Sequence, residues 1–358
     1  MHAYWMRQAL ELAALGTNTT TPNPAVGCVL VDAAGAKVGE GYHQQAGGPH
    51  AEVHALRAAG ERARGATAYV TLEPCNHQGL TGPCSQALID AGVARVVYGM
   101  VDPNPLVSGQ GLARLQAAGI EVKGPCLEAE AQQLNRGFIK RMRDGRPFVT
   151  CKLAMSLDGR TAMASGESKW ITGPAAREDV QRLRARSCAI ITGVGTVLAD
   201  DPSMTWRSQP AGVTRQPLRI VLDRHLQTPP HAAILQQPGT TWLISPKAAP
   251  IASPLAPFVQ TLADDLPTLM AWLASLGCNQ VLLEAGARLA GRFLAAGLID
   301  ELVVYMAPTL LGSSARPLVE LPLAQMSEQV PLRIQSISPV GDDWKILAVP
   351  GKSAVEKS

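Results

Sequence analysis

Four residues in the N-terminal half of the chain combine the side chains of a hydrolytic zinc site. His50 and Glu52 are separated by one residue, and Cys75 and Cys84 each follow a proline. One imidazole and two thiolates fill three corners of a zinc tetrahedron and leave the fourth for water. Glu52 falls about 200° around an ideal helix from His50, so we expect it to carry protons beside that water. The pattern predicts a zinc deaminase, in which activated water attacks an amino-bearing ring carbon.

Prolines also indicate where these ligands stand in the secondary structure. A proline directly before His50 and another before Cys84 predict that both ligands lie at helix N-termini, where the dipole favours a thiolate. The alternative is a closed structural zinc site with a fourth protein ligand. Two histidines could supply that ligand: His54, one helical turn after His50, and His77, two residues after Cys75.

Length and composition limit the classes of protein. A chain of 358 residues predicts two domains, and a net charge of +3 is too small to indicate a nucleic-acid surface. Its seven cysteines do not indicate a disulfide framework, which predicts a cytoplasmic protein. We find neither a signal peptide nor a membrane-spanning stretch, so no membrane partner is expected. The five cysteines outside the zinc motif are expected to be small buried hydrophobic residues: Cys28, Cys126, Cys151, Cys188 and Cys278.

Helices and strands are predicted to alternate along the first half, which indicates an α/β sheet with parallel pairs. The predicted helices are 4–15, 49–60, 83–92 and 111–118, and the predicted strands are 25–31, 66–72, 93–101 and 120–122. A basic stretch ends at Arg146, with a turn at Asp144-Gly145. We interpret this stretch as a solvated connector and divide the chain into domains 1–145 and 146–358.

The second half repeats the alternation. Its predicted strands are 148–155, 189–194, 218–222, 241–244, 281–284 and 302–307, its predicted helices are 175–185 and 287–296, and 332–337 with 344–349 is predicted to form an antiparallel pair. The residues alone leave its site open. Gly193-Val194-Gly195 fits a tight turn as well as a phosphate loop, Glu284 could cap a helix, and Arg184 and Arg207 could be surface cations.

The segment Pro74–Cys84, taken with His50-Ala51-Glu52, resembles the deaminase half of the bifunctional riboflavin-biosynthesis enzymes. The long gap between its two cysteines distinguishes that family from cytidine and transfer-RNA deaminases. Segments 21–27 and 102–105 are similar to substrate-side loops of the family. The resemblance implies that Asn23 contacts the pyrimidine. It also implies a cytidine-deaminase-like three-layer domain followed by a dihydrofolate-reductase-like domain.

The resemblance extends into the second half through the segments 152–159, 168–172 and 193–202. It implies NADPH contacts at Ala154, Trp170, Thr196, Asp200, Gly286, Ala287, Arg288, Leu289, Ala290, Gly291 and Arg292. It implies substrate contacts at Lys152, Ser168, Arg184, Met204, Arg207 and Glu284, with the two arginines holding the substrate phosphate. A homodimer formed through the reductase half is also implied. The chain departs from many relatives at Ala285, where they have glycine, and a close relative has a small residue in place of Arg224, whose cofactor role the sequence leaves open.

The activity implied by the family is two consecutive steps on a small phosphoribosyl pyrimidine. Zinc-dependent hydrolysis converts 2,5-diamino-6-(5-phosphoribosylamino)pyrimidin-4-one to 5-amino-6-(5-phosphoribosylamino)uracil, and NADPH then reduces the ribosyl group to the ribityl product. Two other functions remain as alternatives. One is a nucleic-acid base deaminase with an accessory domain, favoured only by the basic connector. The other is a non-catalytic binding protein stabilised by zinc.

Overall fold

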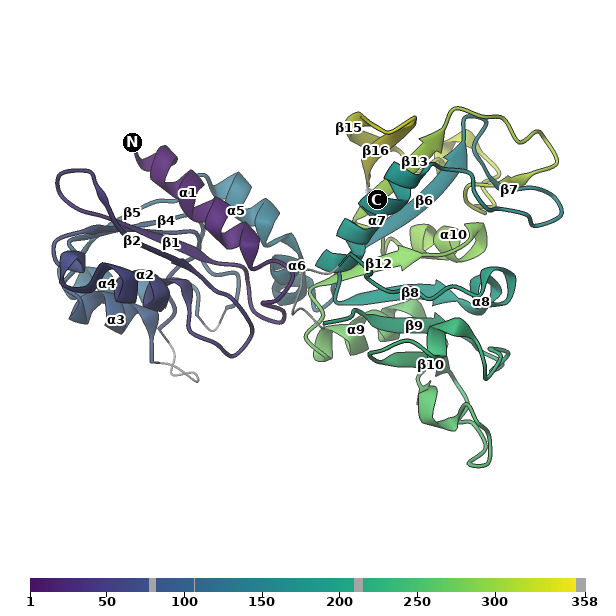
Figure 1. Cartoon of the computed structure of the whole chain (residues 1–358), viewed down its shortest axis with the longest axis horizontal. Helices are drawn as coiled ribbons and strands as arrows, with labels where there is room; N and C mark the ends of the chain where they lie inside the picture. The colour runs from purple at the N-terminus through teal and green to yellow at the C-terminus, as the bar shows by residue number, and fades with distance from the viewer. Residues whose placement is uncertain (77–81, 106, 209–214, 352–358) are drawn as a thin grey trace. The chain divides into compact units, whose positions relative to one another are not determined.

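The computed structural model describes residues 1–76, 82–105, 107–208 and 215–351. The chain forms two compact units, Met1–Arg146 and Pro147–Ser358 (Figure 1). The division falls one residue after the boundary expected from the basic stretch. None of the described helices is long and apolar enough to cross a membrane.

The first unit contains a five-stranded sheet in the order β2-β1-β3-β4-β5. Its strands are β1 Gly27–Val31, β2 Lys37–Tyr42, β3 Thr67–Val70, β4 Arg95–Tyr98 and β5 Glu121–Lys123. Strand β1 runs antiparallel to both β2 and β3, while β3, β4 and β5 are parallel. The parallel pairs were predicted from the sequence, but β2 was not. Strand β2 contains glycines at 39 and 41, which are not typical strand residues, so the sequence pattern did not indicate a strand. Gly39 is needed because a Cβ there would lie 2.4 Å from the Ala55 carbonyl oxygen of the covering helix.

Helices cover both faces of this sheet and make a three-layer domain. They are α1 His2–Leu15, α2 Ala51–Ala59, α3 Cys84–Asp90, α4 Gln110–Ala117, α5 Glu128–Leu134 and α6 Arg136–Asp144, with a 3₁₀ turn η1 Gly60–Ala63. Alternate residues of β1 point to opposite faces. Val29 packs with Met6 of α1, whereas Leu30 belongs to the core that Ala55 of α2 and Leu88 of α3 complete.

The second unit contains a nine-stranded sheet in the order β11-β10-β9-β8-β12-β6-β13-β16-β15. Its strands are β6 Phe148–Ser156, β8 Ala189–Gly193, β9 Leu218–Leu222, β10 Thr241–Ser245, β11 Val259–Thr261, β12 Gln280–Glu284, β13 Glu301–Ala307, β15 Leu332–Val340 and β16 Asp343–Pro350. The strands from β11 to β13 are parallel, and β16 and β15 close the order as the predicted antiparallel pair. Strands β7 Arg160–Ala162 and β14 Arg316–Pro317 form a small separate sheet.

Helices also lie on both faces of the large sheet. They are α7 Pro174–Arg186, α8 Val194–Asp200, α9 Leu266–Ser275 and α10 Ala287–Ala295, with 3₁₀ turns η2 Ala233–Leu235, η3 Ala256–Phe258 and η4 Met326–Glu328. Met270 of α9 and Phe293 of α10 share one core, whereas Val180 of α7 packs against Tyr305 on the other side of the strands. Helix α8 begins immediately after β8, so Gly193-Val194-Gly195 is a strand-to-helix junction.

The cysteine predictions hold with one correction. Cys28, Cys151, Cys188 and Cys278 are buried, as expected for small hydrophobic residues. Cys126 is partly exposed and packs against the core that contains Met6 and Val29. It follows the short edge strand β5, where less chain is available to cover it.

Candidate functional site

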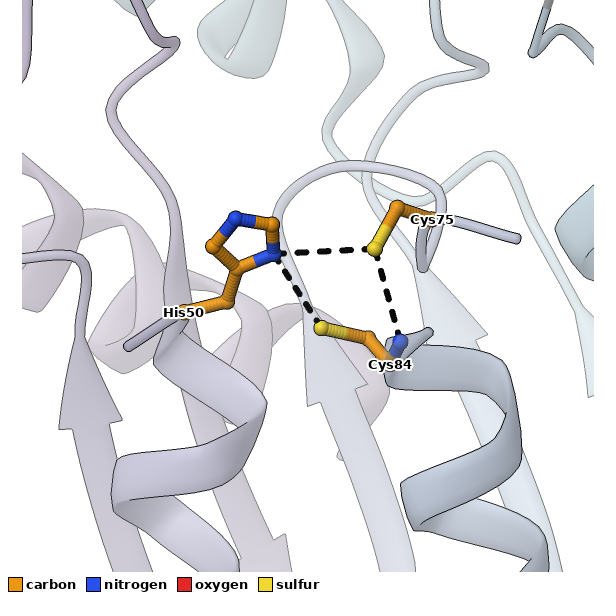
Figure 2. Close-up of side chains that lie close together, drawn as sticks. All are labelled: His50, Cys75 and Cys84. Carbon is orange, nitrogen blue, oxygen red and sulfur yellow. Dashed lines mark hydrogen bonds between the residues drawn. The ribbon is translucent and has the colours of Figure 1, made fainter. Parts of the chain in front are cut away.

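Three elements bring the predicted metal ligands together (Figure 2). His50 is the N-cap residue of α2, Cys84 is the first residue of α3, and Cys75 lies in the segment that follows β3. The Nδ1 atom of His50 lies 3.2 Å from Cys84 Sγ and 3.6 Å from Cys75 Sγ. The backbone N–H of Cys84 also donates to Cys75 Sγ at 3.4 Å. The three ligand atoms therefore share one small volume, all within 4.8 Å of one another.

These separations fit a tetrahedral zinc ion. Zinc lies about 2.3 Å from sulfur and about 2.0 Å from nitrogen, so tetrahedral angles place the nitrogen and sulfur ligands roughly 3.5 Å apart. The two nitrogen–sulfur distances, 3.2 and 3.6 Å, bracket this value. Within the described residues the group stops at three ligands and does not include His54. The other candidate for a fourth ligand, His77, lies outside the described residues. Among the described residues, therefore, the group has the three ligands of an open site.

The electrostatics of the cluster favour a thiolate at Cys75. Hydrogen bonds from the Cys84 thiol, from His50 and from the Cys84 backbone N–H lower the pKa of Cys75 to about 4. The neighbouring Cys75 sulfur and burial raise the pKa of Cys84. A divalent cation between the two sulfurs would reverse that shift, because a coordinating thiol is deprotonated by the metal. The donors thus have the chemistry of a zinc site.

Glu52 lies in the first turn of α2 and is only 3% exposed. Burial raises the pKa of its carboxyl to about 7, although a bound cation would oppose this shift. It is not part of the ligand group but, together with His50 and Cys75, lines a cavity of about 420 Å³. A carboxyl group with a pKa near neutrality can both take up and return a proton.

A buried histidine sets the orientation of Asn23 in this cavity. The Nδ1 atom of His43 lies 3.0 Å from the Pro49 carbonyl oxygen, and its Nε2 lies 3.1 Å from Asn23 Nδ2. A carbonyl oxygen can only accept, so Nδ1 carries the proton and Nε2 of the neutral ring accepts from the Asn23 amide. Burial lowers the pKa of His43, which favours the neutral ring. His43 was not predicted as a site residue, because it follows strand β2, which the sequence pattern did not indicate.

Four of the residues implied as substrate contacts in the second unit lie close together. Lys152 on β6 is in register with Glu284 on β12, and Arg184 of α7 donates to both Glu284 carboxylate oxygens at 2.7 and 2.9 Å. Arg184 also donates to the Thr205 carbonyl oxygen, and its guanidinium lies 3.7 Å from Met204 Sδ. Arg184 is therefore part of a buried ion pair and is not a surface cation. Burial alone would raise the pKa of Glu284, but the charge and hydrogen bonds of Arg184 hold it below its usual value, with smaller contributions from Lys152 and Arg207.

A second group surrounds Asp200 at the end of α8. Ser168 Oγ lies 3.4 Å from Asp200 Oδ1, and Lys169 Nζ donates to the Asp200 carbonyl oxygen at 2.9 Å. The next residue, Trp170, is 70% exposed, and its ring lies under the Arg177 guanidinium at 4.6 Å. Arg177 also donates to the Thr172 carbonyl oxygen at 2.7 Å and so holds this loop from α7. Sequence reasoning missed Lys169 and Arg177, whose roles appear only once the chain is folded.

The remaining residues implied as cofactor contacts differ in how deeply they are buried. Ala154 lies on β6, Thr196 on α8, and Gly286 is the N-cap of α10, followed by Ala287, Arg288 and Leu289. The Leu289 side chain would lie 3.4 Å from a Cβ on Gly193, so the carboxyl ends of β8 and β12 adjoin. Ala290 is fully buried, and a Cβ on Gly291 would lie 2.0 Å from the Glu320 carbonyl oxygen. Ala290 and Gly291 therefore lie on the side of α10 that packs against the protein, whereas Arg292 lies in the last turn of the helix.

The fold and the sites define a zinc-dependent deaminase domain joined to an α/β domain built on a nine-stranded sheet. The cytidine and deoxycytidylate deaminase zinc-binding region matches residues 1–100, and the RibD C-terminal domain matches residues 147–346. The riboflavin biosynthesis protein RibD of Escherichia coli is 54% identical over 95% of this chain and 97% of its own length. That of Haemophilus influenzae is 48% identical over 97% and 96%.

Solved structures agree over the whole chain. Acinetobacter baumannii RibD, form 1, matches with a TM-score of 0.92 at 47% identity, covering 98% of this chain and 99% of its own. The diaminohydroxyphosphoribosylaminopyrimidine deaminase/5-amino-6-(5-phosphoribosylamino)uracil reductase of Thermotoga maritima matches with 0.90 at 31% identity and the same coverage. The chain belongs to the RibD family. It is a bifunctional deaminase and reductase of riboflavin biosynthesis, with a cytidine-deaminase-like N-terminal domain that binds zinc and a dihydrofolate-reductase-like C-terminal domain that implies a nicotinamide cofactor.

Proposed function

We propose that the first unit deaminates 2,5-diamino-6-(5-phosphoribosylamino)pyrimidin-4-one and that the second reduces the ribosyl group of the resulting uracil. The observation that carries the first step is the convergence of His50, Cys75 and Cys84, with ligand atoms within 4.8 Å of one another. The Thermotoga maritima relative is named for the matching pair of activities. The small net charge and the absence of a described basic cluster in the cavity argue against a nucleic-acid substrate.

In the deamination, His50, Cys75 and Cys84 would hold the zinc ion. The metal would lower the pKa of water at its open position and so make it a nucleophile near neutral pH. Glu52 takes the proton released as the water oxygen bonds to C2, and delivers it to a ring nitrogen. Glu52 then takes the proton of the added hydroxyl and passes it to the 2-amino group as the bond between C2 and the amino nitrogen breaks, which releases ammonia and leaves a carbonyl. Asn23, oriented by His43, binds the pyrimidine edge.

In the reduction, Lys152, Ser168, Arg184, Met204, Arg207 and Glu284 would form the substrate site. When bound, NADPH would supply a hydride for the anomeric carbon of the opened ribosyl group, and a proton taken up from solvent would balance the reduction. Arg184 already binds Glu284, so we propose that it fixes that carboxylate and the Thr205 carbonyl group. Arg207 then remains for the substrate phosphate. Asp200, with Ser168 and Lys169 beside it, aligns the cofactor and the ribityl precursor.

For the cofactor we propose NADPH, bound along the carboxyl ends of β6, β8 and β12. Ala154, Trp170, Thr196, Asp200 and the start of α10 would contact it, as in the family. Arg224 follows β9 and pairs with Asp264 at 2.9 Å, so reaching the ribose phosphate would require it to leave this ion pair. A comparison of KM for NADPH and NADH tests the choice of cofactor. Equal values would contradict the proposal.

We also propose a homodimer formed through the second unit. Strand β15 ends the order of the sheet, and Leu332, Ile334 and Ile337 on it are each more than half exposed. Pairing with the same strand of a second copy would cover both the edge and these side chains. Sedimentation equilibrium measures the mass, and Ile334→Asp should lower it to that of one chain.

All seven cysteines are free, which favours the cytoplasm as the compartment.

The proposed activity is tested with the diaminopyrimidinone substrate and purified, zinc-loaded protein. We expect ammonia release without NADPH, and ribityl product only after NADPH is added. A zinc-loaded chain that releases no ammonia from this substrate would contradict the proposed deamination. A chain that makes the uracil but oxidises no NADPH would contradict the proposed reduction.

A further inference from the structure

Glu73 is a buried carboxylate beside the metal ligands that the proton transfers do not use. It lies between β3 and the Pro74-Cys75 pair and is 2% exposed. Within the described residues, none of the ion pairs involves Glu73. A buried carboxylate without a cation is costly unless hydrogen bonds replace its water. Its partners therefore indicate what it does.

The Glu73 carboxylate is satisfied by backbone N–H groups from a single segment. Its Oε2 accepts from Asp102 N at 3.2 Å and from Gly109 N at 2.9 Å, and its Oε1 accepts from Gly111 N at 2.9 Å. Gly109 is the N-cap of α4, and Gly111 lies in its first turn. The carboxylate therefore caps α4 from another element, where the helix dipole favours negative charge.

The backbone on both sides of this carboxylate is tightly fitted. The N–H of Glu73 donates to the Met100 carbonyl oxygen at 2.9 Å. A Cβ on Gly111 would lie 1.8 Å from the Pro74 carbonyl oxygen, so the first turn of α4 lies directly against the residue before Cys75. Glu73 thus attaches both ends of the segment 100–111 to the backbone that carries a metal ligand.

That segment forms part of the wall of the deaminase cavity. Asp102, Asn104 and Val107 line it together with His50, Glu52 and Cys75. Asp102 Oδ1 accepts from Asn104 N at 2.8 Å, which stiffens the turn between them. The position of this wall relative to the metal ligands therefore depends on the three hydrogen bonds to Glu73.

We infer that Glu73 is a positioning residue, which sets the affinity for the pyrimidine substrate by fixing the cavity wall formed by Asp102, Asn104 and Val107 against the Cys75 backbone. This inference rests on the proposed function. Glu73 itself also lines the cavity, but both of its oxygens accept from backbone N–H groups, so we assign it a positioning role and no proton transfer. Both of its oxygens are needed as acceptors. A glutamine would offer one acceptor oxygen and turn an N–H₂ group toward a backbone donor.

The test compares Glu73→Gln with Glu73→Asp and with Glu61→Gln, which removes a carboxylate from an exposed position of the same unit. Ammonia release gives KM and kcat, metal analysis gives the zinc content, and NADPH oxidation on the uracil substrate reports on the second unit. We expect Glu73→Gln to raise KM by about tenfold or more at nearly unchanged kcat and full zinc content, the signature of lost uniform binding. Glu73→Asp should give a smaller rise, and Glu61→Gln none.

A double-mutant cycle shows whether Glu73 acts through the wall. Asn104→Ala should raise KM alone but add little in the Glu73→Gln background, because the wall is already displaced. If Glu73→Gln does not yield folded protein, the same cycle is measured with Glu73→Asp. Multiplicative effects on KM, an unchanged KM, or loss of zinc in parallel with activity would overturn the inference. A wild-type chain that released no ammonia would contradict the proposed function instead.

Discussion

Arg184 and Glu284 form a bidentate ion pair between the last turn of α7 and the end of β12, with N–O distances of 2.7 and 2.9 Å. Both side chains are about one-tenth exposed. Two facing charges are stable in this environment only while their hydrogen bonds are complete. The pair therefore joins a helix to the strand that presents Glu284 beside Lys152.

The pair predicts that Arg184→Lys destabilises the second unit, although it conserves the charge. A lysine cannot reproduce the planar fork that contacts both carboxylate oxygens and the Thr205 carbonyl oxygen. We expect a loss of about 3 kcal/mol in the free energy of unfolding and a large loss of reductase activity. Denaturant unfolding followed with reductase activity measures both. Arg186→Lys, at an exposed position of the same helix, is the control and should change neither.

Glu52→Gln separates proton transfer from metal binding. Glutamine has a similar shape but cannot take a proton from water, so deamination should fall by at least about a thousandfold. Zinc content should stay the same, because Glu52 is outside the ligand group. Reduction of the uracil substrate by NADPH should also persist. Ammonia release, metal analysis and NADPH absorbance give the three readings, and substantial deamination by this variant would contradict the role assigned to Glu52.

Zinc removal should affect one activity only. The ligand group lies in the first unit, and the described part of the second unit contains no comparable cluster of histidine, cysteine and carboxylate side chains. A chelator should therefore abolish ammonia release and leave NADPH oxidation on the uracil substrate unchanged. Adding zinc back should restore ammonia release. Equal loss of both activities would show that the reductase also depends on the metal.

The metal site could be predicted because its signals are local. One residue separates His50 from Glu52, and a proline before each of His50 and Cys84 marks a helix start, which the caps of α2 and α3 confirm. Repeated apolar runs likewise indicated the parallel strands. Strand β2 was missed because its glycines, which let α2 approach, carry no strand signal.

The other contributions to the sites depend on residues far apart in the chain. His43 matters because it lies beside Asn23, and Glu73 because a segment about thirty residues later supplies its hydrogen-bond donors. Arg184 fits a surface cation by its sequence context, yet it is buried against Glu284, one hundred residues away. Partners of this kind follow from tertiary packing, which one sequence does not encode in any local spacing.

Asp200→Asn should impair the reduction alone. The Asp200 side chain lies 3.4 Å from Ser168 Oγ and 3.8 Å from Lys169 Nζ, so its charge contributes to the group assigned to the cofactor. Asparagine preserves the size but removes that charge. We expect kcat for NADPH oxidation to fall by about a hundredfold while ammonia release stays within twofold. The control is Asp342→Asn, at an exposed position of the same unit, because Asp201 accepts from Ala233 N. Loss of both activities would show that the two units are not independent.

A buried polar cluster predicts the response of the second unit to acid. Asp179 Oδ2 of α7 accepts from Tyr305 Oη of β13 at 2.7 Å and from Lys345 Nζ of β16 at 2.6 Å. Burial alone would raise the pKa of Asp179, but the hydrogen bonds from Lys345 and Tyr305 hold it below its usual value. The stabilisation is therefore complete above the unfolded pKa of about 3.9 and is lost as the pH falls through the lower folded pKa.

Tyr305→Phe and Asp179→Asn measure this cluster. The phenylalanine variant loses one hydrogen bond to a charged acceptor and should cost about 2 kcal/mol at pH 7. The asparagine variant should cost more, because it leaves the partly buried Lys345 without its carboxylate. Unfolding free energies at pH 7 and near pH 3 should show the Asp179→Asn deficit shrinking in acid, since the wild-type carboxylate then begins to protonate. A deficit of the same size at both pH values would mean that packing, and not the charge of Asp179, holds α7 against β13 and β16.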